Sequence, residues 1–197
     1  MYFWGINFSE LFKLINKYKS VLRFILTFVG SYFILVLVYN LYLTYGASDT
    51  YYPDIITHTV AQQSESVINA LGYDMKVVPS KVEPAMNLTM DAKVLARVVE
   101  GCNAVSVMLL FISFMLAFFD GWKRTSLFIF GGVALIYGMN IIRIALLTVG
   151  IYEYPAYTEL LHETIFPAVI YGTVFLLWLG WIRSYKKQPR IKKELVE

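Results

Sequence analysis

The stretch Thr125–Gly150 reads TSLFIFGGVALIYGMNIIRIALLTVG, and its length and polarity decide the class of fold. A helix needs roughly 20 consecutive apolar residues to cross the hydrocarbon core of a bilayer. This run exceeds that length and contains one charged residue, Arg143. The stretch therefore predicts a helix that spans a membrane.

The composition of the whole chain agrees with a membrane protein. Its 197 residues are 58% hydrophobic and 16% charged, whereas soluble domains carry about a quarter charged residues. The formal net charge of +3 indicates no nucleic-acid partner, because the Lys and Arg residues lie beside apolar runs and form no single basic face. We expect one membrane domain over residues 1–197, surrounded by the lipid bilayer.

Three further runs approach the same length and polarity, at residues 21–45, 102–119 and 164–183. Together with residues 125–150 they predict an all-α integral membrane protein, a bundle of about four transmembrane helices. The first run is too long for the hydrophobic part of a cleavable signal peptide, so we expect it to remain as an anchor.

The segment between the first and second spans, residues 46–101, is expected to form a small extracytoplasmic helical and hairpin unit. The apolar periodicity of Asp54–Leu71 predicts an amphipathic helix that Gly72 closes. Two short extended runs flank a proline-containing turn and favour a hairpin: Met75–Val78 and Met86–Met90. We expect a last helix, starting near Asp91, to continue into the second span.

Basic residues on the short flanks of the spans predict their orientation. They gather before the first span, between the second and third, and after the fourth: Lys13, Lys17, Lys19, Arg23, Lys123, Arg124, Arg183, Lys186, Lys187, Arg190, Lys192 and Lys193. The link 151–163 instead contains three glutamates and no Lys or Arg. This bias places both termini in the cytoplasm and the link 151–163 outside.

Arg143 lies inside a predicted span, where an arginine at the helix centre costs roughly 2.5–3.5 kcal/mol. The helical rise places it about 27 Å from Thr125, near the external edge of a core roughly 30 Å thick. Asn140 lies one turn earlier on the same face, so the two residues form a polar stripe that should face protein. An interfacial anchor is the alternative interpretation of Arg143.

The single cysteine, Cys102, opens the second predicted span and should lie at the same external level. Ser106 and Ser113 follow at i+4 and i+11 and form a small, weakly polar stripe that another helix can approach. A lone cysteine in a membrane helix is usually a small hydrophobic side chain. The neighbours of Cys102 therefore decide whether it is a nucleophile.

His162 precedes the fourth predicted span, and Pro167 fits the first turn of that helix. We therefore expect His162 in an interfacial turn at the external end. Glu159 and Glu163 are both near enough in sequence to orient its imidazole. The other histidine, His58, lies on the amphipathic segment and is interpreted as a surface residue.

Three predicted helices thus bring a thiol, a guanidinium and an imidazole to one side of the membrane. A Cys/His pair makes a nucleophile when the imidazole takes the thiol proton, and an arginine can stabilise the oxyanion that follows. The sequence contains no zinc-ligand spacing, HExxH, GxSxG or Gly-rich phosphate loop. We expect no metal and no organic cofactor.

Three short motifs resemble those of the exosortase/archaeosortase family, most closely its compact XrtF-type branch. They are VEGCN at 99–103, NIIRI at 140–144 and His162 with the downstream Gly172. The resemblance covers mainly residues 98–181. It implies a membrane cysteine protease/transpeptidase, a thiol hydrolase without cofactor, in the bacterial cytoplasmic (inner) membrane with an extracytoplasmic active site. The implied substrates are membrane-tethered exported proteins with a C-terminal sorting signal, which consists of a short motif, a transmembrane helix and a basic tail.

The same resemblance implies roles for individual residues. Cys102 would be the nucleophile, Arg143 the oxyanion or substrate stabiliser, and His162 the acid/base. Supporting or substrate-binding positions are expected at Asn103, Asn140 and Ser106. The commoner family motif has Ser-Gly after the cysteine, where this chain has Asn103-Ala104, and larger members have about twice as many spans.

A different class of protein remains as the alternative. In a non-catalytic membrane assembly or transport component, Arg143 and Asn140 would lock helices together and Cys102 would be a small filler. A small transporter is disfavoured because the sequence lacks inverted repeats and paired broken helices.

Overall fold

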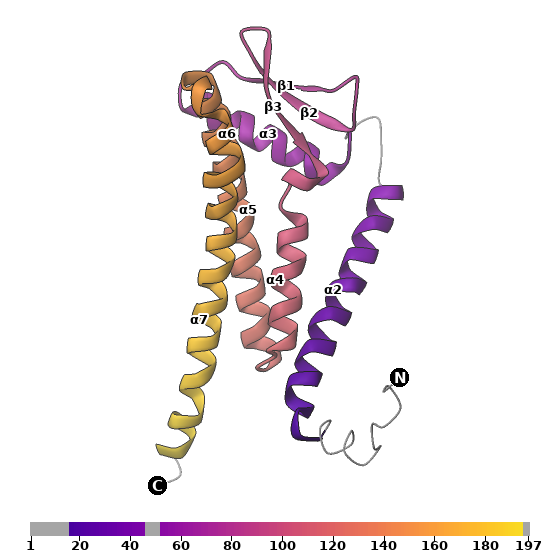
Figure 1. Ribbon diagram of the computed structural model, residues 1–197, viewed down its shortest axis with the longest axis vertical. Helices are drawn as coiled ribbons and strands as arrows, with labels where there is room; N and C mark the ends of the chain where they lie inside the picture. Colours follow the sequence, from indigo (N-terminus) through magenta and orange to yellow (C-terminus); the bar gives the residue numbers. More distant parts are fainter. Residues whose placement is uncertain (1–15, 46–51, 195–197) are drawn as a thin grey trace, which may run out of the picture.

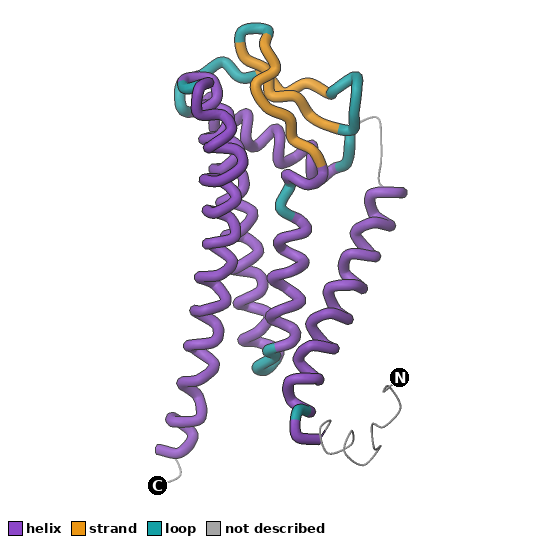
Figure 2. The backbone as a smooth tube through the Cα atoms, viewed as in Figure 1, coloured by secondary structure: helices purple, strands orange, loops and turns teal. Residues whose placement is uncertain are grey.

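The computed structural model describes residues 16–45 and 52–194, with side chains as far as Ser184. Four apolar helices make up most of it: α2 (Lys19–Tyr45), α4 (Val105–Ala117), α5 (Trp122–Glu153) and α7 (Phe166–Glu194). They extend along the long axis, and a small sheet lies at one end (Figures 1 and 2). Lys13, residues 46–51 and the side chains of the basic tail beyond Ser184 lie outside the described part.

Three helical segments overlap predicted spans and are long and apolar enough to cross a membrane: Lys19–Tyr45, Trp122–Glu153 and Pro155–Ser184. The fourth apolar helix, α4, has 13 residues and is about 20 Å long, which is shorter than a hydrocarbon core of roughly 30 Å. This helix begins at Val105, three residues after the approximate start predicted for the second span at residue 102. The reason is Ala104, whose left-handed backbone (φ 62°) interrupts a right-handed helix.

The cap, residues 52–99, contains helix α3 (Ile55–Ala70) and strands β1 (Lys76–Pro79), β2 (Ala85–Met90) and β3 (Lys93–Val99). The predicted amphipathic helix is confirmed as α3. The Asp54 carboxylate caps its start by accepting the N–H groups of Ile56 at 2.9 Å and Thr57 at 3.1 Å. Gly72 ends it in a left-handed conformation (φ 99°), as the sequence predicts.

The three strands form one antiparallel sheet in the order β1-β2-β3. The predicted hairpin is present as β1 and β2. The helix expected from Asp91 is wrong, because the chain turns back at Asp91-Ala92 and continues as β3. Both turn residues have positive φ (51° and 60°), the handedness that suits a two-residue hairpin. Pairing with β2 then holds residues 93–99 extended.

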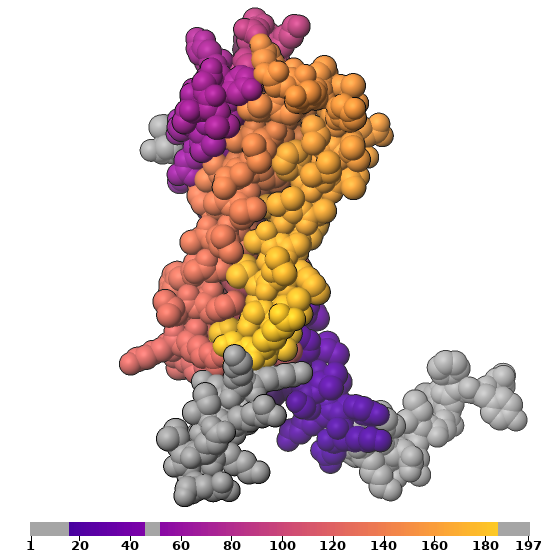
Figure 3. Space-filling view, turned by 90° about the vertical axis from the view of Figure 1, so that its left-hand side faces the viewer, coloured from indigo at the N-terminus to yellow at the C-terminus, as the bar shows by residue number. Residues whose placement is uncertain are grey.

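Two apolar clusters hold the molecule together. In the first, α3 packs against the cap end of α5 and β2 packs against α3, and Val60, Leu88 and Ala145 are at most 1% exposed. The second joins α4, α5 and α7 around Phe111 and Trp181. The space-filling view shows α7 against α5, with the start of α7 at the same end as the cap (Figure 3). The cap is therefore fastened to the end of α5 that carries Arg143.

Candidate active site

Cys102 lies in a 3-10 turn, Glu100–Cys102, that connects β3 to α4. Its thiol is free and half-buried. Because Cys102 precedes α4, it does not share a helical face with Ser106, and the predicted stripe of Cys102 with Ser106 and Ser113 is wrong. Ser106 is exposed and lies outside the cavity described below, whereas Ser113 is buried and donates to the Leu109 carbonyl at 2.8 Å.

Asn103 is completely buried directly after the cysteine. Its Nδ2 donates to the hydroxyls of Tyr39 at 2.8 Å and Thr57 at 3.1 Å, and its Oδ1 accepts the Val105 N–H at 3.0 Å. One side chain thus joins α2, α3 and the start of α4 behind Cys102. The left-handed residue that follows, Ala104, occupies the position of the glycine in the commoner family motif, where a glycine meets no steric penalty.

Asn140 is completely buried and connects Cys102 to Arg143. Its Nδ2 donates to the Cys102 carbonyl oxygen at 2.8 Å, and its Oδ1 accepts from Arg143 Nη1 at 3.1 Å. The two α5 residues therefore contact each other, as their spacing predicts. Within the described part of the chain, the buried Nε of Arg143 has no hydrogen-bond partner and the guanidinium forms no ion pair.

His162 lies in a π-helical turn, Leu161–Ile165, inside a continuous helical run that leads into α7. The expectation of a separate turn before the helix is therefore wrong. The wide turn has a local cause, because Pro167 lacks an N–H and its ring would collide with the carbonyl four residues earlier. Instead, the Phe166 N–H bonds to the Leu161 carbonyl, five residues back. Such π turns are frequent at functional sites.

His162 is exposed, and its imidazole lines the cavity described below. Neither Glu159 nor Glu163 forms an ion pair with it in the part of the chain that the structure describes. The other histidine, His58, lies elsewhere, with Nδ1 3.1 Å from the Tyr52 carbonyl oxygen in a half-buried position on α3. His162 is thus the histidine that accompanies Cys102.

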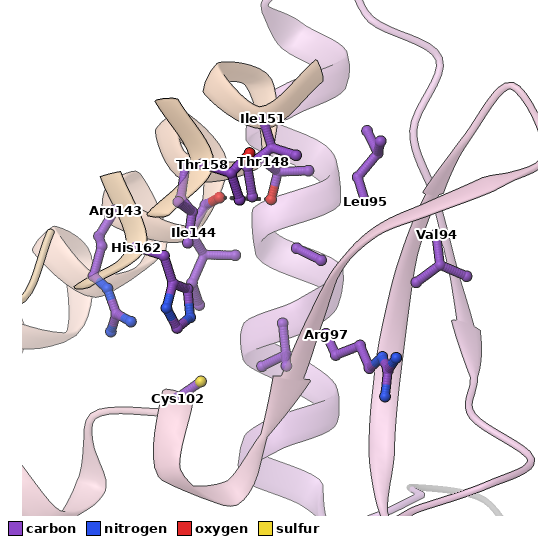
Figure 4. Close-up of a pocket in the computed structure, with 13 residues that line it drawn as sticks. Val94, Leu95, Arg97, Cys102, Arg143, Ile144, Thr148, Ile151, Thr158 and His162 are labelled. Atoms are coloured by element: carbon purple, nitrogen blue, oxygen red, sulfur yellow. Dashed lines mark hydrogen bonds between the residues drawn. The ribbon is translucent and has the colours of Figure 1, made fainter. Parts of the chain in front are cut away.

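Cys102, Arg143 and His162 line one cavity of about 370 Å³. Figure 4 shows the sulfur, the guanidinium and the imidazole pointing into it from three different elements. The rest of the wall comes from β3, from α5 and from the turn before α7: Val94, Leu95, Ala96, Arg97, Val98, Ile144, Leu147, Thr148, Ile151 and Thr158. The cavity lies where the cap meets the helices.

Sequence reasoning missed two parts of this wall. The β3 residues were missed because that segment was expected to be helical. Thr148 and Ile151 could have been predicted from the sequence, since their spacing places them on the same face of α5 as Arg143 and Ile144. Across the described residues, no three His, Cys, Asp or Glu side chains gather in a group that could bind a metal ion.

The long apolar helices define an integral membrane protein of the helical class. The family model described as transmembrane exosortase (Exosortase_EpsH) matches residues 20–182. Because this match covers most of the chain, the protein belongs to the transmembrane exosortase family, and the resemblance seen in the sequence is confirmed at this level. No curated protein and no solved structure matches the chain. Family membership implies protein substrates that carry sorting signals, and a lipid bilayer around the protein.

Proposed function

We propose that this protein is a membrane-embedded cysteine protease/transpeptidase that cleaves the C-terminal sorting signals of exported proteins. One observation carries the proposal: Cys102, Arg143 and His162 come from three separate elements and line the same cavity. A thiol and an imidazole that share a cavity are the parts of an activated nucleophile. The adjacent guanidinium supplies the positive charge that a tetrahedral intermediate requires.

In the proposed reaction, the Cys102 sulfur attacks the carbonyl carbon of the scissile peptide bond while His162 takes the thiol proton. The carbonyl oxygen becomes an oxyanion that faces Arg143. The carbon–nitrogen bond then breaks, His162 returns the proton to the leaving amine, and a thioester remains on Cys102. An amine or a water molecule attacks the thioester and regenerates the thiol. Neither step requires a metal or a redox partner.

The surrounding hydrogen bonds support these roles. Asn140 holds the Cys102 carbonyl, so the backbone that carries the sulfur is tied to α5. It binds Nη1 of Arg143, so the other terminal nitrogen, Nη2, remains for a substrate oxygen, whereas Nε is buried. Asn103 is buried directly after Cys102, and its side chain accepts the Val105 N–H and so fixes the start of α4. Asn140 and Asn103 are therefore positioning residues in this proposal.

The proposed setting is the bacterial inner membrane, with both termini in the cytoplasm and the cavity on the extracytoplasmic side. The basic residues Lys123 and Arg124, in the first turn of α5, support this orientation, since α5 begins at the end of the helices opposite the cap (Figure 1). The substrates would be membrane-tethered, so that the bond to be cut lies just outside the bilayer.

Thiol labelling tests the proposal directly, because Cys102 is the only cysteine in the sequence. Membrane-impermeant maleimide added to cells should label the wild type, and His162→Ala should slow labelling at least roughly tenfold if the imidazole activates the thiol. His58→Gln is the matched control, since His58 lies outside the cavity. Equal labelling rates in wild type and His162→Ala would overturn the activated thiol.

The Asn140 contacts also support a second candidate, a non-catalytic membrane component. In that protein the Arg143–Asn140–Cys102 hydrogen bonds would only fasten α5 to the cap. This candidate predicts that Cys102→Ser leaves function unchanged, while Arg143→Ala lowers the amount of protein in the membrane. If the protein is an enzyme, Cys102→Ser should abolish its function, because a hydroxyl is a much weaker nucleophile than a thiolate at neutral pH.

A further inference from the structure

Strand β3 is an edge of the sheet. The strand order is β1-β2-β3, so β2 covers one side of β3, and no other described strand pairs with its second side. An edge strand presents a row of N–H and C=O groups that are free to pair with another extended chain. This edge is next to the candidate catalytic residues.

The cavity lies along that free edge. Five consecutive β3 residues line it, from Val94 to Val98. Successive side chains of a strand point to opposite faces, so a cavity over one face would contact every second residue. A bulge beside Leu95 interrupts this alternation, but Val94 and Arg97 line the cavity together with Ala96 and Val98. Contact on both sides of the bulge favours a cavity that reaches the edge of the strand and its backbone.

The edge also leads directly to the nucleophile. Strand β3 ends at Val99, and the turn Glu100–Cys102 follows at once. The opposite wall consists of α5 and the turn before α7, with the apolar side chains of Leu147 and Ile151 among its residues. Figure 4 shows β3 descending toward Cys102, with Leu95 and Ile151 on either side of the space. The cavity is thus a channel that leads from the cap to the sulfur.

We infer that the substrate segment upstream of the scissile bond binds in an extended conformation as an additional strand on the free edge of β3. This inference rests on the proposed function. Main-chain hydrogen bonds to β3 would hold the segment in register and place the scissile carbonyl at Cys102, a mode known as β-strand addition. Affinity then comes mainly from the peptide backbone, and the channel walls select side chains that fit between Leu95 and α5.

The direction of the added strand follows from the geometry. The acyl end of the substrate is attached at Cys102, which lies beyond the C-terminal end of β3. The residues that precede it extend from there toward Val94, so the segment is parallel to β3. The residues that follow the scissile bond leave in the opposite direction, toward the membrane helices, where the transmembrane helix of a sorting signal would lie.

Peptidyl chloromethyl ketones provide the test on the full-length protein in detergent. The probe is acetyl-hexaalanyl chloromethyl ketone, whose extended peptide of about 20 Å can follow β3 from Cys102 almost to Val94. The Cys102 thiolate displaces its chloride as the carbon–sulfur bond forms. Its control is the same peptide with N-methyl groups on the two central alanines, which removes two N–H donors. One of these two neighbouring N–H groups points toward β3, so we expect the unmethylated peptide to alkylate Cys102 roughly tenfold faster, since loss of that hydrogen bond weakens binding. Iodoacetamide, which has no peptide strand, measures the intrinsic thiol reactivity.

Hydrogen exchange of the labelled protein identifies the binding edge. Those amides of residues 94–98 that point to the free edge should exchange more slowly after labelling with the hexaalanyl probe and not after labelling with iodoacetamide. The amides of β1, at the opposite edge of the same sheet, are the internal control and should not change. A photoreactive group on the N-terminus of the peptide should crosslink near Val94, as the parallel direction requires.

The outcomes separate the inference from the proposed function. Equal rates for the two peptides, or no protection of β3, would overturn strand addition even if iodoacetamide labelling depends on His162. Labelling by iodoacetamide that is unaffected by His162→Ala would overturn the activated thiol, while the exchange data would still report whether the peptide binds β3. If residues 94–98 are already protected from exchange in the unlabelled protein, and that protection disappears when the protein is diluted, a second copy of the chain occupies the edge, and the inference is overturned.

Discussion

Helix α5 and the junction between β3 and α4 both supply groups to the cavity, but they position them by different means. On α5, Asn140 and Arg143 are three residues apart, and regular helical geometry brings their side chains within 3.1 Å. The junction has no regular repeat of backbone geometry. Cys102 is in a 3-10 turn, and the left-handed residue Ala104 separates this turn from α4. The guanidinium thus depends on local geometry, while the sulfur depends on contacts that hold an irregular backbone.

The largest expected effect is at the junction. Cys102→Ala removes the proposed nucleophile and should reduce processing roughly a thousandfold or more. The measurement is cleavage of a co-expressed membrane protein that ends in a hydrophobic helix and a basic tail. Ser66→Ala, on the exposed side of α3, is the control for expression and should be processed normally. Normal processing by Cys102→Ala would refute the proposed chemistry.

Asn140 joins the two regions, so its variants show how strongly they are coupled. Asn140→Ala leaves the Cys102 carbonyl and Arg143 without this partner and should lower processing roughly 10- to 100-fold, about 1–3 kcal/mol. Asn140→Asp keeps the acceptor for Arg143 and loses the donor to Cys102. The rate at which iodoacetamide labels Cys102 in purified protein should therefore differ from the wild-type rate in both variants. A loss of protein abundance with normal labelling of the remaining molecules would mean that Asn140 serves stability alone.

Pro167 tests the wide turn that carries His162. Pro167→Ala restores an N–H and removes the collision, so we expect the turn to tighten toward an α-helix. Removing the extra residue of a π turn rotates what precedes it by about 100°, which would turn the imidazole away from the cavity. His162-dependent thiol labelling should fall roughly tenfold. Pro155→Ala, in the preceding 3-10 turn, is the control, and an unchanged rate in Pro167→Ala would show that tertiary contacts alone maintain the turn.

Two neighbouring glycines on α5 test packing independently of the chemistry. A Cβ at Gly132 would overlap the Phe111 ring, whereas a Cβ at Gly131 meets open space. Gly132→Ala should destabilise the protein by about 1–3 kcal/mol through overpacking. Gly131→Ala should be neutral or slightly stabilising, since alanine favours helix. Thermal unfolding in detergent measures both, and equal stabilities would mean that α4 and α5 separate easily at this point.

Ser106 has the smallest expected effect. The sequence suggested a supporting position, but the side chain is exposed and lies outside the cavity. Ser106→Ala should change processing less than about twofold, as expected for a surface substitution. A tenfold loss would mean that the face of α4 that carries Ser106 belongs to the site after all, and would weaken the distinction between the junction and the regular helices.

The residues that were predicted well are those whose position depends on nearby sequence. The helix predicted over Asp54–Leu71 and its end at Gly72 agree with α3, because helical period and termination involve groups a few residues apart. Asn140 and Arg143 were placed together by helical spacing. Strand β3 was missed because lysine, leucine, alanine and arginine at 93–97 also favour helix, and pairing with β2 overrides that preference.

By itself, the sequence determined that the chain is a helical membrane protein, which residues share a face of α5, and where α3 begins and ends. Apolar run length, helical period and capping are local properties, and they act within a few turns of one segment. Only the tertiary structure decided that residues 93–99 form an edge strand, that Cys102 precedes α4, and that the thiol, guanidinium and imidazole line one cavity. Those features require strand pairing and hydrogen bonds between segments far apart in the chain, and the sequence of one segment alone does not reveal which distant partner it will contact.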